Sequence, residues 1–112
     1  METVLTHTPA DVADRLLALA RLYREGQASE LMDRTLDKLL AQEAKLNQSQ
    51  LAQLQTDLHA FEAQYALASD EFYHRFQTGQ TDDRMDFVEW ASLVQMRDNL
   101  QARLKVLTGQ TA

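Results

Sequence analysis

The longest uninterrupted pattern in the sequence runs from Glu30 to about Ala66, without glycine or proline and rich in Ala, Leu, Gln, Glu and Lys. These residue types favour a helix, and at ~1.5 Å per residue about 36 of them would span on the order of 50 Å. Within the segment, steps of four and three residues alternate, which is the heptad spacing of a helical seam. We therefore predict a long helix whose seam packs against another helix, of the same chain or of a second copy. The seam consists of Leu40, Ala44, Asn47, Leu51, Leu54 and Leu58, and continues to Phe61 and Tyr65.

Two features of this segment leave alternatives open. The polar run at residues 47–50 would allow a hairpin, with Ser49 as the N-cap of its second arm, although the lack of glycine and proline favours a continuous helix. Asn47 falls on the seam, where a buried Asn fixes register and oligomeric state at a cost in stability. The alternative is that the seam drifts at this point and that Asn47 faces water.

Capping residues and glycines divide the rest of the chain into helices. Thr8, Pro9 and Asp11 form a helix start, and glycine suits the residue that follows a helix end. The helices are expected at about 9–25, 30–66, 70–78 and 83–107, begun by Thr8, Ser29, Ser69 and either Thr81 or Asp82, with ends at Gly26, Gly79 and Gly109.

Composition supports an all-α fold. The 112 residues suit one domain over residues 1–112, and three glycines with one proline are too few to supply the turns of a sheet protein. We expect a long central helix with a coiled-coil-like seam, an N-terminal helix, and a C-terminal helical hairpin packed back on it. Because a helix of ~50 Å cannot bury its stripe against one partner of ~37 Å, we expect a homodimer that forms a dimeric helical bundle.

The net charge of −6 narrows the range of partners. It disfavours binding to nucleic acid by the protein alone and to an anionic membrane surface, and it is compatible with a basic protein partner. The opening residues do not show the pattern of a signal peptide, and no stretch reaches the ~20 apolar residues of a membrane span. For these two reasons we expect a cytoplasmic protein. Between Asp70 and Glu89, six acidic residues face two arginines, so a helix-turn-helix contact with DNA is disfavoured there.

Seven of the eight aromatic residues follow residue 60. They would form a small hydrophobic core at the junction of the last three helices, or a partner pocket, since Trp and Tyr are common binding hot spots. Combined with the acidic segment, they define a candidate contact surface for a partner. Its residues are Phe72, Tyr73, Phe76, Asp82, Asp83, Asp86, Glu89 and Trp90.

The sequence contains few motifs that are typical of enzymes. There is no cysteine, no glycine-rich phosphate loop and no nucleophile elbow, so we expect no enzymatic activity and no cofactor. Glu71 and His74 form a Glu-x-x-His motif, the i, i+3 spacing of ferritin-like di-metal carboxylate proteins, and Glu62 or Glu43 of a homodimer would complete such a site. This di-metal protein is one alternative function, and a structural coiled-coil assembly subunit is another.

About half of the chain, residues 58–107, carries a family resemblance. The pattern is Phe61-Glu62 followed by Tyr65, then Ser69-x-Glu71-Phe72-Tyr73-x-Arg75-Phe76-x-x-Gly79, then Asp83 and Asp86-Phe87-x-Glu89-Trp90. It resembles small bacterial all-helical proteins that look like the antitoxin-like partner of toxin–antitoxin gene pairs. The resemblance implies a non-enzymatic interaction protein with a basic protein partner, and it assigns no catalytic residue.

Overall fold

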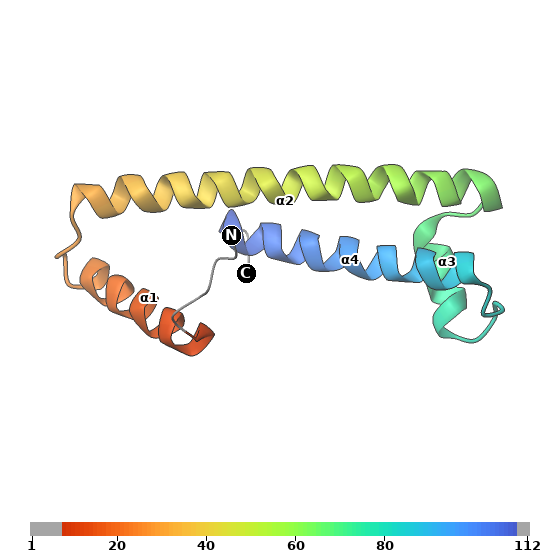
Figure 1. The fold of residues 1–112 in the computed structure, drawn as a ribbon, viewed down its shortest axis with the longest axis horizontal. Helices are drawn as coiled ribbons and strands as arrows, with labels where there is room; N and C mark the ends of the chain where they lie inside the picture. The colour runs from red at the N-terminus through yellow and green to blue at the C-terminus, as the bar shows by residue number, and fades with distance from the viewer. Residues whose placement is uncertain (1–7, 110–112) are drawn as a thin grey trace, which may run out of the picture. The chain divides into compact units, whose positions relative to one another are not determined.

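The computed structural model describes residues 8–109, and it consists of helices joined by short turns (Figure 1). Its elements are α1 (Pro9–Arg24), α2 (Glu30–Tyr65), α3 (Ser69–Gln77) and α4 (Met85–Leu107). The prediction of an all-α fold with four helices is confirmed. The reading of the N-terminus as lacking a signal peptide rests partly on residues 1–7, which lie outside the described residues.

The central helix is continuous over its 36 residues, Asn47 to Gln50 included. The hairpin alternative is therefore wrong. Because the run of polar residues contains neither glycine nor proline, nothing in it removes a backbone hydrogen bond or favours a left-handed residue.

The helix starts agree with the sequence at α1 and α2 and differ at α3 and α4. The helix α3 begins at Ser69, one residue earlier than expected, with Ala68 at its N-cap position. Thr8 caps α1 in a reciprocal pair of hydrogen bonds with Asp11, and the Ser29 hydroxyl accepts the backbone N–H of Met32 at 3.2 Å. The last helix begins at Met85 rather than at residue 83, without a side-chain cap. The Asp82 carboxylate accepts the backbone N–H and the guanidinium of Arg84 instead, which holds residues 82–84 in a turn before the helix.

The helix ends use left-handed residues, as the glycine positions predict. Gly26, Gly79 and Gly109 have positive φ and follow the last turns of α1, α3 and α4, where glycine adopts this conformation without a steric cost. At the end of α2 the same role falls to Ala66, with φ of 52°. The next residue, Leu67, donates its N–H back to the Glu62 carbonyl and so closes the turn.

The chain divides into two compact units, Met1–Lys38 and Leu39–Ala112, and α2 contributes to both. In the first unit, the Tyr23 hydroxyl donates to the Asp33 carboxylate at 2.7 Å. This hydrogen bond, which favours the protonated phenol, raises the pKa of Tyr23 to about 12. None of the described residues of this unit is buried.

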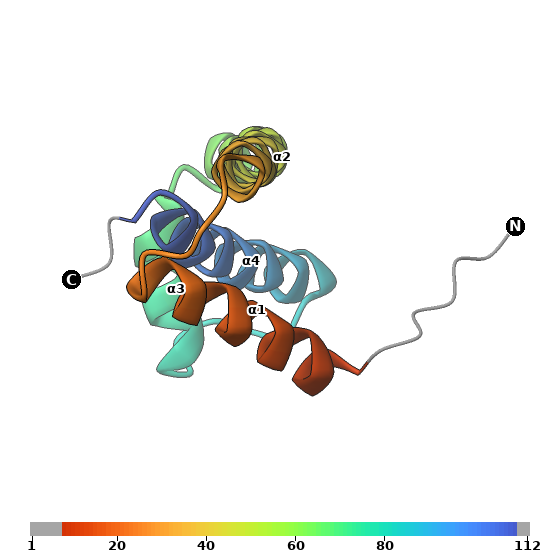
Figure 2. The same cartoon turned by 90° about the vertical axis from the view of Figure 1, so that its left-hand side faces the viewer.

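In the second unit, α4 runs antiparallel to the C-terminal half of α2, and the two helices lie side by side in both views (Figures 1 and 2). Asn47 of α2 bonds to Leu100 of α4, and Tyr65 at the far end of α2 bonds to Asp86 at the start of α4. The short helix α3 is fixed to α4 by the ion pair between Asp70 and Arg97 at 2.6 Å. The predicted packing of the long helix against the C-terminal helix is thus confirmed.

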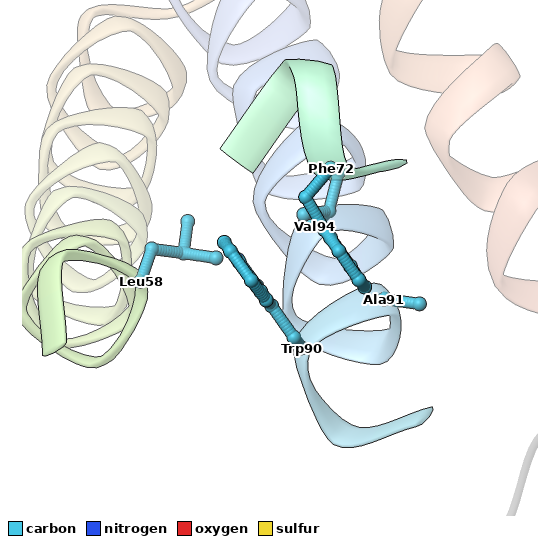
Figure 3. Close-up of a cluster of buried hydrophobic side chains, with 5 residues drawn as sticks. All are labelled: Leu58, Phe72, Trp90, Ala91 and Val94. Atoms are coloured by element: carbon cyan, nitrogen blue, oxygen red, sulfur yellow. The ribbon is translucent and has the colours of Figure 1, made fainter. Parts of the chain in front are cut away.

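The hydrophobic core lies where the three helices of this unit meet (Figure 3). Leu58 comes from α2, Phe72 from α3, and the remaining members from α4. Four positions of the predicted oligomer seam are buried by the chain itself. The core residues are Leu58, Phe72, Trp90, Ala91 and Val94, and the buried seam positions are Asn47, Leu51, Leu54 and Leu58.

The seam prediction therefore needs a correction. Its C-terminal two thirds is covered within a single chain, because α4 is long enough to reach back to Asn47. The other two seam positions differ, since Leu40 remains 44% exposed and Ala44 is half-buried. Among the six seam positions, Leu40 and Ala44 are therefore the ones that the described residues of the chain leave least covered.

Candidate interaction surfaces

Two of the predicted contact residues belong to the core instead. Trp90 and Phe72 are 0% and 1% exposed, and their rings stack face to face with centroids 3.9 Å apart. The indole N–H of Trp90 donates to the buried Ser69 hydroxyl at 3.0 Å. Placing Phe72 and Trp90 on a contact surface was wrong, because α3 folds over the start of α4 and excludes solvent from both rings.

The other two predicted aromatic residues lie at the edge of this core. Tyr73 and Phe76 are half-buried and pack against it. The Tyr73 hydroxyl accepts a hydrogen bond from the side chain of Gln95 on α4 at 3.0 Å. Both residues are only partly buried, so they remain available to a partner.

The predicted acidic residues divide into two kinds. Asp82 pairs with the Arg84 guanidinium, and the hydrogen bonds between them lower the pKa of the Asp82 carboxyl to about 2. Asp86 accepts the Tyr65 hydroxyl, which raises the pKa of that phenol. In contrast, Asp83 and Glu89 are exposed, and within residues 8–109 neither forms an ion pair.

Glu62 has a structural role that the sequence did not reveal. Its carboxylate accepts the backbone N–H of Ser69 at 2.8 Å and so caps α3 from the preceding helix. Ala68, the residue before α3, has no side chain that could do this. The hydrogen bonds from Ser69 lower the pKa of the Glu62 carboxyl. The arrangement also places a negative charge at a helix N-terminus, where it stabilises the helix.

We expect Glu62→Gln to lower the free energy of unfolding by about 0.5–1 kcal/mol near neutral pH, because the amide keeps an acceptor but loses the charge. A group whose pKa is lowered in the folded state contributes stability above its unfolded pKa and loses it as the pH falls. The difference between the wild type and the variant should therefore begin to shrink as the pH falls below about 4.5, the ordinary Glu value, and disappear once the pH passes below the lowered pKa of Glu62. Urea unfolding as a function of pH measures this, and Glu89→Gln, which removes an exposed carboxylate, should show no such convergence.

A second structural element is the buried amide of Asn47, which is 0% exposed. Its nitrogen donates to the Leu100 carbonyl at 2.9 Å, and its oxygen accepts from the Arg103 guanidinium at 3.2 Å. Arg103 also pairs with Glu43 at 2.6 Å. Asn47 is thus a buried seam position, but it fixes the register of α4 on α2 within one chain.

Asn47→Ala should cost about 1–3 kcal/mol of unfolding free energy, since it removes two hydrogen bonds between the helices and leaves a void. Gln48→Ala is the matched control, because it changes the adjacent, exposed position of the same helix. Thermal unfolding followed by circular dichroism compares the two variants. Equal melting temperatures would contradict the role given to the Asn47 amide.

The Glu-x-x-His motif gathers no further ligands from residues 8–109. Glu71 pairs with Arg75 at 3.0 Å, and His74 is exposed near the end of α3. Among residues 8–109, no three His, Asp or Glu side chains gather as metal ligands would. Glu62 and Glu43, the proposed completing residues, are engaged with Ser69 and Arg103. The di-metal alternative therefore has no site within a single described chain.

An apolar groove of about 520 Å³ lies along the α2–α4 pair. Four apolar side chains line it, and four polar residues complete the lining. The heptad spacing of α2 predicted a buried seam but gave no sign of a groove beside it, since its α2 wall is largely polar in sequence. The apolar residues are Leu54, Leu93, Met96 and Leu100, and the polar ones are Gln50, Gln53, Asp57 and Asn99.

A second apolar surface lies on α1, which has no buried residue. Four of its six large apolar residues recur along one side at steps of four and three, as on the side of a helix that packs against another element. Leu16, at 52% exposure, lies near the centre of this stripe. The stripe consists of Val12, Leu16, Leu19 and Tyr23.

None of the helices within residues 8–109 combines the length and the apolar character needed to cross a membrane. Comparison of the chain with protein-family models, with curated proteins and with solved structures gave no significant match. The fold and the surfaces described above are therefore the basis of the functional proposal.

Proposed function

We propose that the protein is a non-enzymatic interaction module that works as a homodimer. The observation that carries the proposal is the N-terminal unit, whose described residues form helices without a single buried side chain. Hydrophobic burial is the main source of stability in a protein, and short isolated helices are marginal in water. The exposed apolar stripe of α1 is the kind of surface that a partner covers.

The test is the mass of the chain in solution, measured by sedimentation equilibrium. We expect the mass of two chains for the wild type and of one chain for Leu16→Glu. The carboxylate would be buried without a partner, which costs several kcal/mol, and each ~1.4 kcal/mol is a factor of ten in the dissociation constant.

Ala18→Glu is the matched control for this experiment. It introduces the same charge into the same helix, but two residues further on, about 200° around the helix from Leu16. It should leave the dimer intact. A wild-type chain that stays monomeric at every accessible concentration would overturn the proposal.

The acidic surface favours a second candidate function, the antitoxin-like binding of a basic protein. Asp83 and Glu89 are exposed carboxylates without ion pairs among the described residues. Asp83 lies in the turn between α3 and α4 and Glu89 on α4, while the half-buried rings of Tyr73 and Phe76 lie on α3, which is paired with α4. Electrostatic complementarity of this kind speeds association and selects partners by charge.

Co-purification with the product of the neighbouring gene tests this function. Binding should weaken as salt is added and should be lost in the double variant Asp83→Lys/Glu89→Lys. The control is the double variant Glu30→Lys/Asp37→Lys, which reverses two charges in the N-terminal unit and should leave binding intact. If both double variants bind as the wild type does, the acidic surface is not the contact.

A further inference from the structure

The groove beside α2 and α4 exposes apolar surface that no described residue of the second unit covers. Met96 is 51% exposed, and it lies in the groove with Leu54, Leu93 and Leu100. A groove between two antiparallel helices, lined by both apolar and polar side chains, is the kind of surface into which an amphipathic helix packs. The question is which helix fills it.

The length of α1 excludes it as the occupant within its own chain. The Tyr23 hydroxyl is bonded to Asp33, so this end of α1 is tied to the start of α2. From Tyr23, the 14 residues back to Pro9 extend ~21 Å in whichever direction α1 points, whereas Leu54 lies ~32 Å along α2 from Asp33. The α1 of the same chain therefore stops short of the centre of the groove, whereas the α1 of a second copy is not tethered to this α2.

The stripe of α1 has the chemistry that the groove requires. Val12, Leu16, Leu19 and Tyr23 stand at the i, i+4, i+7 and i+11 positions of one helix face, which is the anchor pattern of a helix in a groove. Arg15 adjoins this stripe in sequence, and within residues 8–109 it forms no ion pair.

The charges on the groove are of the opposite sign. Asp57 lines it, and Glu89 lies seven residues before Met96 and so on the same side of α4. Neither carboxylate has an ion-pair partner among residues 8–109. The apolar stripe of α1 and Arg15 beside it thus match the apolar side chains and the acidic residues of the groove.

We propose that α1 of a second copy docks in the α2–α4 groove, and that the exchange is reciprocal about a two-fold axis. The length of α2 makes this arrangement feasible, because its midpoint falls between Asn47 and Gln48. Two such helices that cross antiparallel at their midpoints place residues 33–47 of one beside residues 48–62 of the other. Each α1 then comes beside the groove of the opposite chain, and both exposed apolar surfaces are covered at once.

This inference rests on the proposed homodimer, and cysteine cross-linking tests it separately. The chain has no cysteine, so two introduced thiols are the only ones present, and Leu16 and Met96 are both half-exposed positions outside the core. Chains with Leu16→Cys are mixed with longer, tagged chains with Met96→Cys and treated with a short bismaleimide. We expect a cross-linked product that contains one chain of each length.

Two controls and the solution mass separate the outcomes. Ala18→Cys mixed with Met96→Cys should give little product, because residue 18 lies on the opposite side of α1. A product formed as readily from Leu16→Cys chains alone would mean that α1 packs against α1, and would overturn the docking. A dimeric mass without the mixed product would overturn the docking and leave the homodimer standing, whereas a monomeric mass would overturn both.

Discussion

Trp90→Ala should lower the free energy of unfolding by about 3–5 kcal/mol, the usual cost of deleting a buried Trp or Phe ring. Trp90 is 0% exposed, it stacks on Phe72, and its ring lies within 5.7 Å of the centroids of Phe61 and Tyr65. The substitution also leaves the buried Ser69 hydroxyl without its donor. The total free energy of unfolding of a small domain is only ~5–15 kcal/mol. Most of the stability of the second unit should therefore be lost.

Urea unfolding followed by circular dichroism at 222 nm measures this loss, because the variant has no Trp left to report by fluorescence. Val88→Ala is the control on the same helix, at a position 43% exposed, and should change stability by less than about 0.5 kcal/mol. If Trp90→Ala folds as the wild type does, the indole is not the centre of the core. That result would favour the other interpretation of Trp90, as an anchor for a partner.

Leu58→Ala is expected to have the second-largest effect, a loss of about 2–4 kcal/mol. Leu58 is 3% exposed and packs in the cluster with Trp90 and Val94 of its own chain. The cost should therefore be the same in the wild-type background and in the Leu16→Glu background, in which we expect monomers. If Leu58 belonged instead to a seam between two chains, Leu58→Ala would lower the stability only in the background that forms the dimer.

Leu46→Ala is the matched control, a leucine of the same helix that is 52% exposed. In the Leu16→Glu background it should cost less than about 1 kcal/mol, because a surface substitution leaves the core intact. Equal losses for Leu46→Ala and Leu58→Ala would mean that burial within the chain does not distinguish the two faces of α2.

The helices could be predicted from sequence because their signals are local. The capping residues Thr8 and Ser29, the glycines after α1, α3 and α4, and the uninterrupted run of α2 each act within a few residues. The start of α4 was missed by two residues, since Asp82 bonds to Arg84 in a turn rather than capping the helix. Element boundaries depend on such competition between a cap and a turn.

The surfaces could not be predicted in the same way, because they depend on which elements meet. The heptad positions of α2 indicated a seam, but sequence spacing does not say whether α4 or a second chain covers it. Phe72 and Trp90 were assigned to a contact surface because aromatic residues serve cores and interfaces alike. Glu62 was missed as a cap because its acceptor role joins residues seven apart across a turn.

The distribution of burial along α2 divides one helix into two thermodynamic regimes. Its buried residues all lie between Asn47 and Leu58, while its first turns, from Glu30 onward, contribute none. Backbone amides open locally at a cost that follows the burial around them. Backbone amides near Leu54 and Leu58 should therefore exchange with solvent only when the second unit unfolds as a whole. Those near Leu31 should exchange by fraying of a single helix. Covering α1 and the start of α2 with a second chain would remove this difference, so the exchange of these first amides with solvent deuterium would depend on protein concentration.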